Sequence, residues 1–299
     1  MKYAITAVTG RFGQVAVHEL AKLVPASDII GLARNVEKAQ KMVPADVTVR
    51  PGDYTQEATL ADSLQGVDRL LFISSQPGAE VPRDQQHMAV VRAAKKAGVN
   101  WIGYTSFPHA DQTTSGLAED HRKTEAAIIE SGIAHSFLRN NWYLENELDT
   151  IKGAIAGQPF VYGAGDSHVG WTLERLYAEA AAKVLAMTDS KDIYEFVGAP
   201  ATYADLAESV AQLTNQEFAV SSLSIAEYQK GLEASGLPAE VVGVVTMIQS
   251  LIRDGELDEV SSDLPDVLGR PLPSLTAALQ ELLPSRIKIE NPFEIEVKR

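Results

Sequence analysis

The sequence contains no cysteine. Disulfide bonds, thiolate zinc sites and thiol catalysis are therefore excluded, and the composition fits a reducing cytoplasm, where we expect the protein to reside. The six histidines show no His-Glu-x-x-His spacing, so we predict no metal site. Apolar runs long enough to cross a bilayer are also missing. The chain opens at once on strand-like residues, so we expect no signal peptide.

Basic residues are scarce, with 26 Lys and Arg against 40 Asp and Glu and a net charge of -14. A surface this acidic repels nucleic-acid phosphates and anionic lipids, so we predict neither a nucleic-acid nor a membrane partner. A neutral substrate, or a small anion held by a local basic site, stays open. The 299 residues, 45% of them apolar, suit one large or two modest globular domains.

Short apolar runs alternate with helix-like segments through the first half of the chain. This alternation predicts an α/β fold with a doubly wound parallel sheet, because parallel strands need helical crossovers. The predicted strands are Tyr3–Val8, Ile29–Ala33, Val47–Val49, Leu70–Ile73, Trp101–Tyr104 and His135–Leu138. The predicted helices are Phe12–Leu23, Val36–Met42, Gln56–Leu64, Arg83–Ala97 and Asp120–Ser131, with Gly98 and Gly132 ending the last two.

The regular alternation of predicted strands and helices ends after residue 139. We predict a nucleotide-binding domain over 1–139, with elements around 160–200 returning to it, and a smaller mixed α/β cap over 140–299. Its predicted helices are Tyr143–Ala156, Leu173–Met187, Tyr203–Leu213, Ile225–Ala234 and Leu275–Leu282, and its predicted strands are Phe160–Tyr162, Tyr194–Val197 and Ala219–Leu223. The final residues, 285–299, alternate apolar and polar like an edge strand, and a tail is the alternative.

The stretch "ITAVTGRFGQ" carries a glycine pattern between the first strand and the first helix. Backbone N–H groups and the dipole at a helix N-terminus bind a pyrophosphate, so the strand–loop–helix context favours a dinucleotide site. Its predicted contacts are Thr9, Gly10, Arg11, Phe12 and Gly13. Ala7 replaces the first glycine, which would cost roughly 1–2 kcal/mol if φ is positive there. An ordinary turn without a ligand is the alternative.

The second predicted strand ends at Arg34, where NAD sites usually carry an acid. A guanidinium suits a 2′-phosphate, so we predict NADP(H) as the cofactor, with Arg11 and Lys38 as helpers. A solvated surface arginine is the alternative. Ligands of open α/β sheets lie beyond the carboxyl ends of strands. That rule adds Asp53 and Tyr54 for adenine, Ser74, Ser75, Thr105 and Ser106 for the cofactor, and Phe107, Asn141, Trp142 and Tyr143 for the acceptor.

Several motifs together resemble the NmrA-like branch of the atypical short-chain dehydrogenases, and within it the type 2 NADPH:quinone oxidoreductases. They are "TAVTGRFGQ", "LARNVEKAQ", "VRPGDY", "GVDRLLFISS", "AAKKAGVNWIGYTS" and "SGIAHSFLRNNWYLEN". The resemblance implies a Rossmann domain holding NADPH and a cap over the nicotinamide. It implies the pyrophosphate on residues 10–13, the 2′-phosphate on Arg34 and the nicotinamide near Ser75, Thr105 and Asn141.

Typical short-chain dehydrogenases use a Tyr-x-x-x-Lys pair, whose tyrosine donates a proton to a carbonyl. Here Leu117 and His121 stand at that spacing, and leucine cannot transfer protons. We therefore predict hydride transfer to a quinone without a side-chain acid, with His121 and Asn141 as candidate catalytic residues. Rival hypotheses are a non-catalytic NADP(H) sensor and, disfavoured by Leu117, a nucleotide-sugar epimerase or dehydratase. A homodimer is left open.

Overall fold

The computed structural model describes residues 1–113 and 115–283. Its centre is a seven-stranded sheet with the order β3-β2-β1-β4-β5-β6-β8, in which every pairing is parallel. The strands are β1 (Tyr3–Ile5), β2 (Ile29–Ala33), β3 (Thr48–Pro51), β4 (Arg69–Phe72), β5 (Trp101–Ser106), β6 (Ala134–Asn140) and β8 (Ile193–Phe196). The order reverses between β1 and β4, which creates the switch point where such sheets bind ligands. The predicted α/β fold is confirmed.

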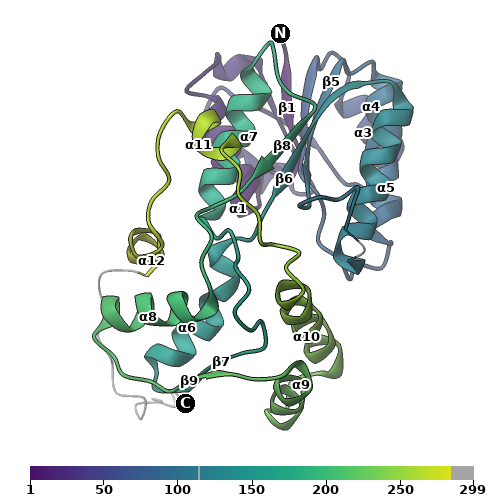
Figure 1. The fold of residues 1–299 in the computed structure, drawn as a ribbon. Coiled ribbons are helices and arrows are strands. Elements are labelled where there is room, and N and C mark those ends of the chain that lie inside the picture. Colours follow the sequence, from purple (N-terminus) through teal and green to yellow (C-terminus); the bar gives the residue numbers. More distant parts are fainter. Residues whose placement is uncertain (114, 284–299) are drawn as a thin grey trace, which may run out of the picture.

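Helices cover both faces of this sheet (Figure 1). One layer packs α3 (Glu57–Ser63), α4 (Arg83–Ala97) and α5 (Gly116–Ser131) side by side. In the other layer, α7 (Glu174–Ala186) packs against both α1 (Arg11–Leu20) and α11 (Asp263–Leu268). Strand residues therefore alternate between two apolar cores. Ile5 and Leu71 join the core under α1 and α7, whereas Ala4 and Leu70 join the core under α3 and α4. A short helix, α2 (Val36–Gln40), follows β2.

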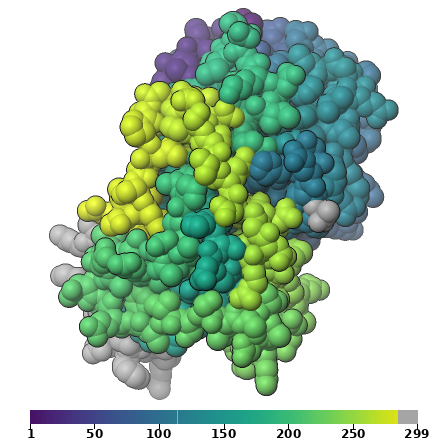
Figure 2. Space-filling model, viewed as in Figure 1, coloured from purple at the N-terminus to yellow at the C-terminus, as the bar shows by residue number. Residues whose placement is uncertain are grey.

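The cap forms a second lobe below the sheet, and the lobes meet at a narrower middle (Figure 2). It contains the 3₁₀ turn Leu144–Glu147, α6 (Leu148–Ile155), α8 (Tyr203–Thr214), α9 (Ile225–Ala234), α10 (Ala239–Arg253) and α12 (Leu275–Leu282). A two-stranded sheet pairs β7 (Phe160–Tyr162) with β9 (Val220–Ser222). The segment 254–262 leads from α10 back up to α11 (Figure 1).

Sequence patterns located most elements but missed two helices. Helix α4 spans the predicted residues, and Gly98 and Gly132 adopt the left-handed conformation that ends α4 and α5. The missed helices are α10 and α11, the first a run of valines and isoleucine with weak helix propensity. The predicted division at residue 139 stays a prediction, and β8 lies in the main sheet. The predicted edge strand or tail, 285–299, falls outside the described residues.

Within the described residues, the longest helix, α5, has 16 residues, and none combines the length and apolarity needed to cross a bilayer.

Candidate cofactor and acceptor site

A cleft of about 290 Å³ opens beyond the carboxyl ends of β4, β5 and β6. Its lining mixes residues from both lobes of the chain, since the cleft lies where β6 leads into the cap. The residues predicted from sequence that line it are Arg11, Phe12, Ser74, Ser75, Thr105, Ser106, Phe107, His121, Asn141, Trp142 and Tyr143. Thr9, Gly10, Gly13, Arg34, Asp53 and Tyr54 do not line this cleft. The sheet topology thus brings together side chains that are more than 100 positions apart in the sequence.

The glycine loop has one strained residue, Ala7, whose φ of 53° lies in the left-handed region. The Ala7 carbonyl accepts a hydrogen bond from Gly10 N at 2.9 Å. It also faces Gly13, where an added Cβ would lie 2.4 Å from the Ala7 oxygen. Glycine is therefore required at position 13, because the helix packs on this carbonyl. The positive φ costs alanine roughly 1–2 kcal/mol, so the loop holds its shape at the expense of stability.

The residues predicted to bind the adenine and 2′-phosphate end of the cofactor differ in exposure and in the hydrogen bonds that they already make. Arg34 is exposed at the end of β2, and Asn35 caps α2 beside it. Asp53 Oδ1 accepts from the backbone N and the hydroxyl of Thr55, which leaves Oδ2 available for a ligand. Arg34 and Asp53 thus stay candidates for the 2′-phosphate and adenine.

Tyr54 requires a correction, because its position is that of a core residue. It is only 8% exposed, and its hydroxyl donates to the Ile73 carbonyl oxygen at 2.7 Å and lies 2.5 Å from Thr6 Oγ1. Burial raises the pKa of the Tyr54 phenol. The predicted packing against adenine is therefore not supported, because the ring ties β3 to β1 and β4.

The floor of the cleft is hydrogen-bonded through short polar side chains. Thr105 Oγ1 accepts from Ser74 N at 2.8 Å, and Ser75 N donates to His87 Nε2 at 3.0 Å. The Ser106 hydroxyl donates to Glu125 Oε1 at 2.6 Å, and Glu125 forms a buried bidentate pair with Arg139. Because its hydroxyl proton is already donated, Ser106 fixes the floor rather than offering a donor to a ligand.

At the cap side, two neighbouring asparagines end β6 and differ in what their amides do. Asn141 donates from Nδ2 to the Leu257 carbonyl and accepts from Trp142 N through Oδ1. Asn140 donates to the Tyr143 hydroxyl, but its Oδ1 is buried without a partner among the described residues. Asn140 therefore holds a free acceptor in the cleft, suited to a carboxamide NH₂. Sequence reasoning favoured Asn141, whose amide mainly joins β6 to the segment 254–262.

The acceptor end has aromatic walls and a buried histidine pair. The Phe107 ring centroid lies 6.1 Å from that of His121, and Trp142 donates from Nε1 to Glu147. His121 Nδ1 lies 2.9 Å from the Tyr104 hydroxyl, and its Nε2 lies 3.0 Å from Arg83 Nη2. Burial, and secondly Arg83, hold the pKa of His121 well below its ordinary value. His121 is therefore neutral, and its Nε2 lone pair accepts from Arg83.

Sequence reasoning missed two charged residues of the cleft, Arg83 and Glu174. Arg83 begins α4 and was read only as a helix residue. Glu174 begins α7, far along the chain, and its Oε2 lies 3.2 Å from Arg11 Nε. Burial raises the pKa of Glu174, although Arg11 lowers it. Only the sheet topology shows that these side chains reach the cleft.

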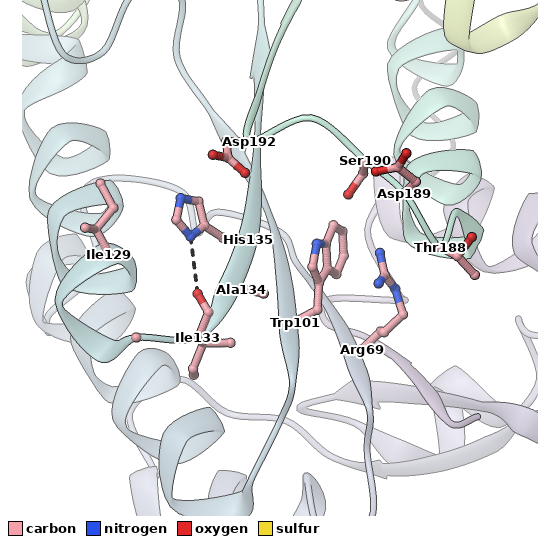
Figure 3. A pocket seen from close by; sticks show the side chains of 11 residues that line it. Arg69, Trp101, Ile129, Ile133, Ala134, His135, Thr188, Asp189, Ser190 and Asp192 are labelled. Atoms are coloured by element: carbon pink, nitrogen blue, oxygen red, sulfur yellow. Dashed lines mark hydrogen bonds between the residues drawn. The ribbon is translucent and has the colours of Figure 1, made fainter.

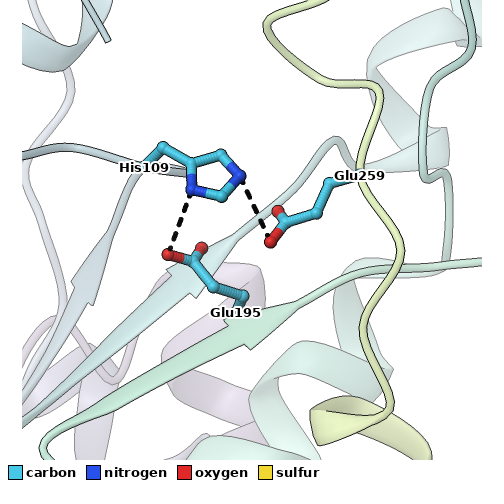
Figure 4. A group of neighbouring side chains, drawn as sticks. All are labelled: His109, Glu195 and Glu259. Carbon is cyan, nitrogen blue, oxygen red and sulfur yellow. Dashed lines mark ion pairs between the residues drawn. The ribbon is translucent and has the colours of Figure 1, made fainter. Parts of the chain in front are cut away.

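A separate group lies at the edge of β8, where His109 sits between two carboxylates (Figure 4). Its Nδ1 is 3.7 Å from Glu195 and its Nε2 is 3.2 Å from Glu259. Burial and the Glu195 charge raise the pKa of Glu259 to about 7. One ligand atom from each of the three side chains lies within 4.8 Å of the other two, and Glu195 also pairs with Arg139.

Comparison with known proteins places this geometry in context. A family model described as NAD(P)H-binding matches residues 8–161. Quinone oxidoreductase 2 of Escherichia coli (strain K12) is 36% identical over 281 residues, covering 93% of this chain and 98% of that protein. The crystal structure of the NADPH-dependent E. coli enzyme complexed with NADPH superposes with a TM-score of 0.88, at 36% identity, over 94% of this chain and 99% of that chain.

A second solved structure is nearly as similar. Citrobacter sp. triphenylmethane reductase complexed with NADP(H) gives a TM-score of 0.86 at 31% identity, over 95% of this chain and 100% of that chain. The likeness thus extends through the cap as well as the sheet.

Proposed function

The chain belongs to the NAD(P)H-binding family, in the group that contains the quinone oxidoreductases, and we propose that it is an NADPH-dependent oxidoreductase that reduces quinones. The observation that carries this proposal is the likeness to the NADPH-bound quinone oxidoreductase over 94% of this chain, the cap included. NADP(H), when bound, supplies the hydride. The protein's own residues bind it, orient the acceptor and keep water out.

We assign the cofactor to the carboxyl edge of the sheet, from the glycine loop at residues 10–13 to the end of β6. The α1 N-terminus with residues 10–13 suits the pyrophosphate, because the N–H groups and the dipole at a helix N-terminus favour an anion, although Gly10 N already donates to the Ala7 carbonyl. Arg34 suits the 2′-phosphate. The free Oδ1 of Asn140 suits the nicotinamide carboxamide, and it is buried at the place where such a group would enter. Phe107 and Trp142 form walls for a flat acceptor ring.

The residues of the site favour a reaction in which water, and not a side-chain acid, protonates the reduced acceptor. Leu117, at the tyrosine position of typical dehydrogenases, packs against the apolar core. Tyr104 has no exposed surface, and its hydroxyl contacts His121 and His87, whose pKa values are both lowered by burial. A quinone tolerates this arrangement, since its two-electron reduction yields an aromatic anion that water can protonate. Proximity and orientation then provide most of the rate enhancement.

Steady-state NADPH oxidation with and without a simple quinone tests the proposal. We expect quinone-dependent turnover with NADPH and much slower turnover with NADH. Arg34→Asp should reverse or abolish that preference, while Lys38→Gln, one turn into α2, should change it less. Tight NADPH binding without turnover on a panel of quinones would instead support the NADP(H) sensor. A cytoplasmic location and a homodimer stay predictions from the sequence.

A further inference from the structure

Arg83 is a cleft arginine whose donors are only partly used. It lines the cleft at the N-terminus of α4. Its Nη2 donates to His121 Nε2 at 3.0 Å, whereas its Nε is buried and has no hydrogen-bond partner among the residues that the structure describes. Across residues 1–113 and 115–283 no carboxylate lies within ion-pair distance of it. An unpartnered buried guanidinium N–H is costly unless a ligand oxygen accepts from it.

The positive charge of Arg83 is not cancelled by its surroundings. Burial, and secondly the charge of Arg83, lower the pKa of His87 to about 3. His121 is neutral for the same two reasons. Both imidazoles thus face the guanidinium uncharged. The other cleft arginine, Arg11, differs because Glu174 pairs with it. The cleft therefore has one neutralised cation at the phosphate end and one unneutralised cation at the acceptor end.

We propose that Arg83 binds the acceptor oxygen that becomes negatively charged during reduction. This inference rests on the proposed function and adds a substrate class to it. Acceptors that are neutral or anionic and end as an oxyanion, such as quinones and their sulfonated forms, are preferred. Cationic dyes are disfavoured, because they would place a second positive charge beside the guanidinium.

The chemistry balances with the components already named. A hydride, carrying two electrons, leaves NADPH, which becomes NADP⁺, and reduces the neutral quinone to a hydroquinone monoanion. One proton from water then neutralises that anion. Arg83 donates hydrogen bonds to the oxygen as charge develops on it, so its interaction is stronger in the transition state than with the bound quinone. His121 is a positioning residue, because its lone pair holds one guanidinium N–H in place.

A binding experiment tests Arg83 without requiring turnover. The probe is 4-nitrophenolate at mildly alkaline pH, titrated calorimetrically into the protein saturated with NADP⁺, with uncharged 4-nitroanisole as the matched neutral probe. Arg83→Gln should weaken phenolate binding by about tenfold or more, as expected for a lost hydrogen bond to a charged group. Binding of 4-nitroanisole should stay within about twofold.

Arg92→Gln is the matched control. Arg92 lies on the same helix and pairs with Glu57 on the surface, so the variant makes the same change in net charge away from the cleft. It should bind both probes like the wild type. Arg83→Lys retains the charge but loses the Nε donor and the planar fork, and should fall between wild type and Arg83→Gln. Circular dichroism verifies that each variant is folded.

Turnover supplies the second readout. With a sulfonated naphthoquinone, kcat/KM of Arg83→Gln should fall by about 100-fold, comparable to removing an oxyanion donor. With a cationic triphenylmethane dye it should stay level or rise. Unchanged phenolate binding in Arg83→Gln, or a loss of NADP⁺ affinity greater than the loss of phenolate affinity, would overturn the inference. If no acceptor is reduced but the phenolate still requires Arg83, the proposed function fails while this binding site stands.

Discussion

The two ends of the central sheet each carry a hollow with an arginine, and they differ in how that arginine is used. The amino-end hollow is the larger, about 440 Å³ against 290 Å³ for the carboxyl-end cleft. Its Arg69 donates to the carbonyls of Leu185 and Val184 and lies 3.8 Å above the Trp101 ring (Figure 3). Arg83 at the other end has a buried Nε without a partner.

Unused polar groups therefore identify the functional end better than volume does. Arg69 donates to the Leu185 carbonyl at the C-terminus of α7, where the last carbonyls of a helix have no partner within the helix. The carboxyl-end cleft instead retains an unpartnered donor on Arg83 and an unpartnered acceptor on Asn140. A binding site keeps such groups unsatisfied until its ligand arrives, at a cost in stability. Four variants test this contrast.

The largest effect is expected from Gly13→Ala, at the carboxyl end. The new Cβ would lie 2.4 Å from the Ala7 carbonyl oxygen, so the loop or α1 must shift. We expect NADPH affinity, measured by fluorescence titration, to fall by 100-fold or more, because about 3 kcal/mol of binding corresponds to that factor. Gly10→Ala is the control for folding, since its Cβ would have ordinary contact at 3.4 Å. Wild-type affinity in Gly13→Ala would contradict the cradle geometry.

Arg69→Met, at the amino end, should change stability and leave function intact. The substitution removes the Arg69 donor from the Leu185 carbonyl, while Val184 keeps the Met187 N–H, and this loss should cost about 2 kcal/mol in the free energy of unfolding. Urea denaturation measures this loss. NADPH affinity and quinone turnover should stay within about twofold. Asp189→Asn, in the same hollow, should alter neither quantity. A folded Arg69→Met protein with impaired turnover would mean that the amino-end hollow is functional.

Glu174→Gln should strengthen cofactor binding, because a carboxylate now competes for Arg11 near the expected pyrophosphate. We expect roughly fivefold tighter NADP⁺ binding at mildly alkaline pH, about 1 kcal/mol. Burial raises the pKa of Glu174, so the wild-type carboxyl becomes protonated and neutral as pH falls. The NADP⁺ affinities of the wild type and of Glu174→Gln should therefore become equal in acid. Glu179→Gln, on the same helix and paired with Arg270, is the control. A gain that persists in acid would exclude the charge explanation.

Ala7→Gly should have the smallest effect. Glycine adopts a φ of 53° without strain, but it also loses more freedom on folding, so we expect a net stabilisation below about 1 kcal/mol. NADPH affinity should change by less than about tenfold. Asn215→Gly relieves a similar φ, 52°, at the end of α8 and should stabilise the protein without any effect on binding. A larger gain in affinity for Ala7→Gly would show that the natural loop is impaired.

Sequence periodicity predicted the sheet well because its strands are continuously apolar and its helices end at legible signals such as Gly98 and Gly132. The same information located the cleft, since parallel strands bring their carboxyl ends together. It could not separate Asn140 from Asn141, which point in different directions along one strand, nor show that Tyr54 turns into the core. Arg83 and Glu174 were missed because helix starts reach the cleft only through the tertiary packing.

The packing of α1 against α7 has a consequence for how the protein is made. Helix α1 ends at Leu20, but α7 begins at Glu174, and β6 gains its outer neighbour only with β8. Translation proceeds at about 5–20 residues per second, so α7 is synthesised on the order of ten to thirty seconds after α1. The apolar side of α1 lacks its packing partner during that time. The nucleotide-binding half thus cannot be completed before part of the cap has left the ribosome.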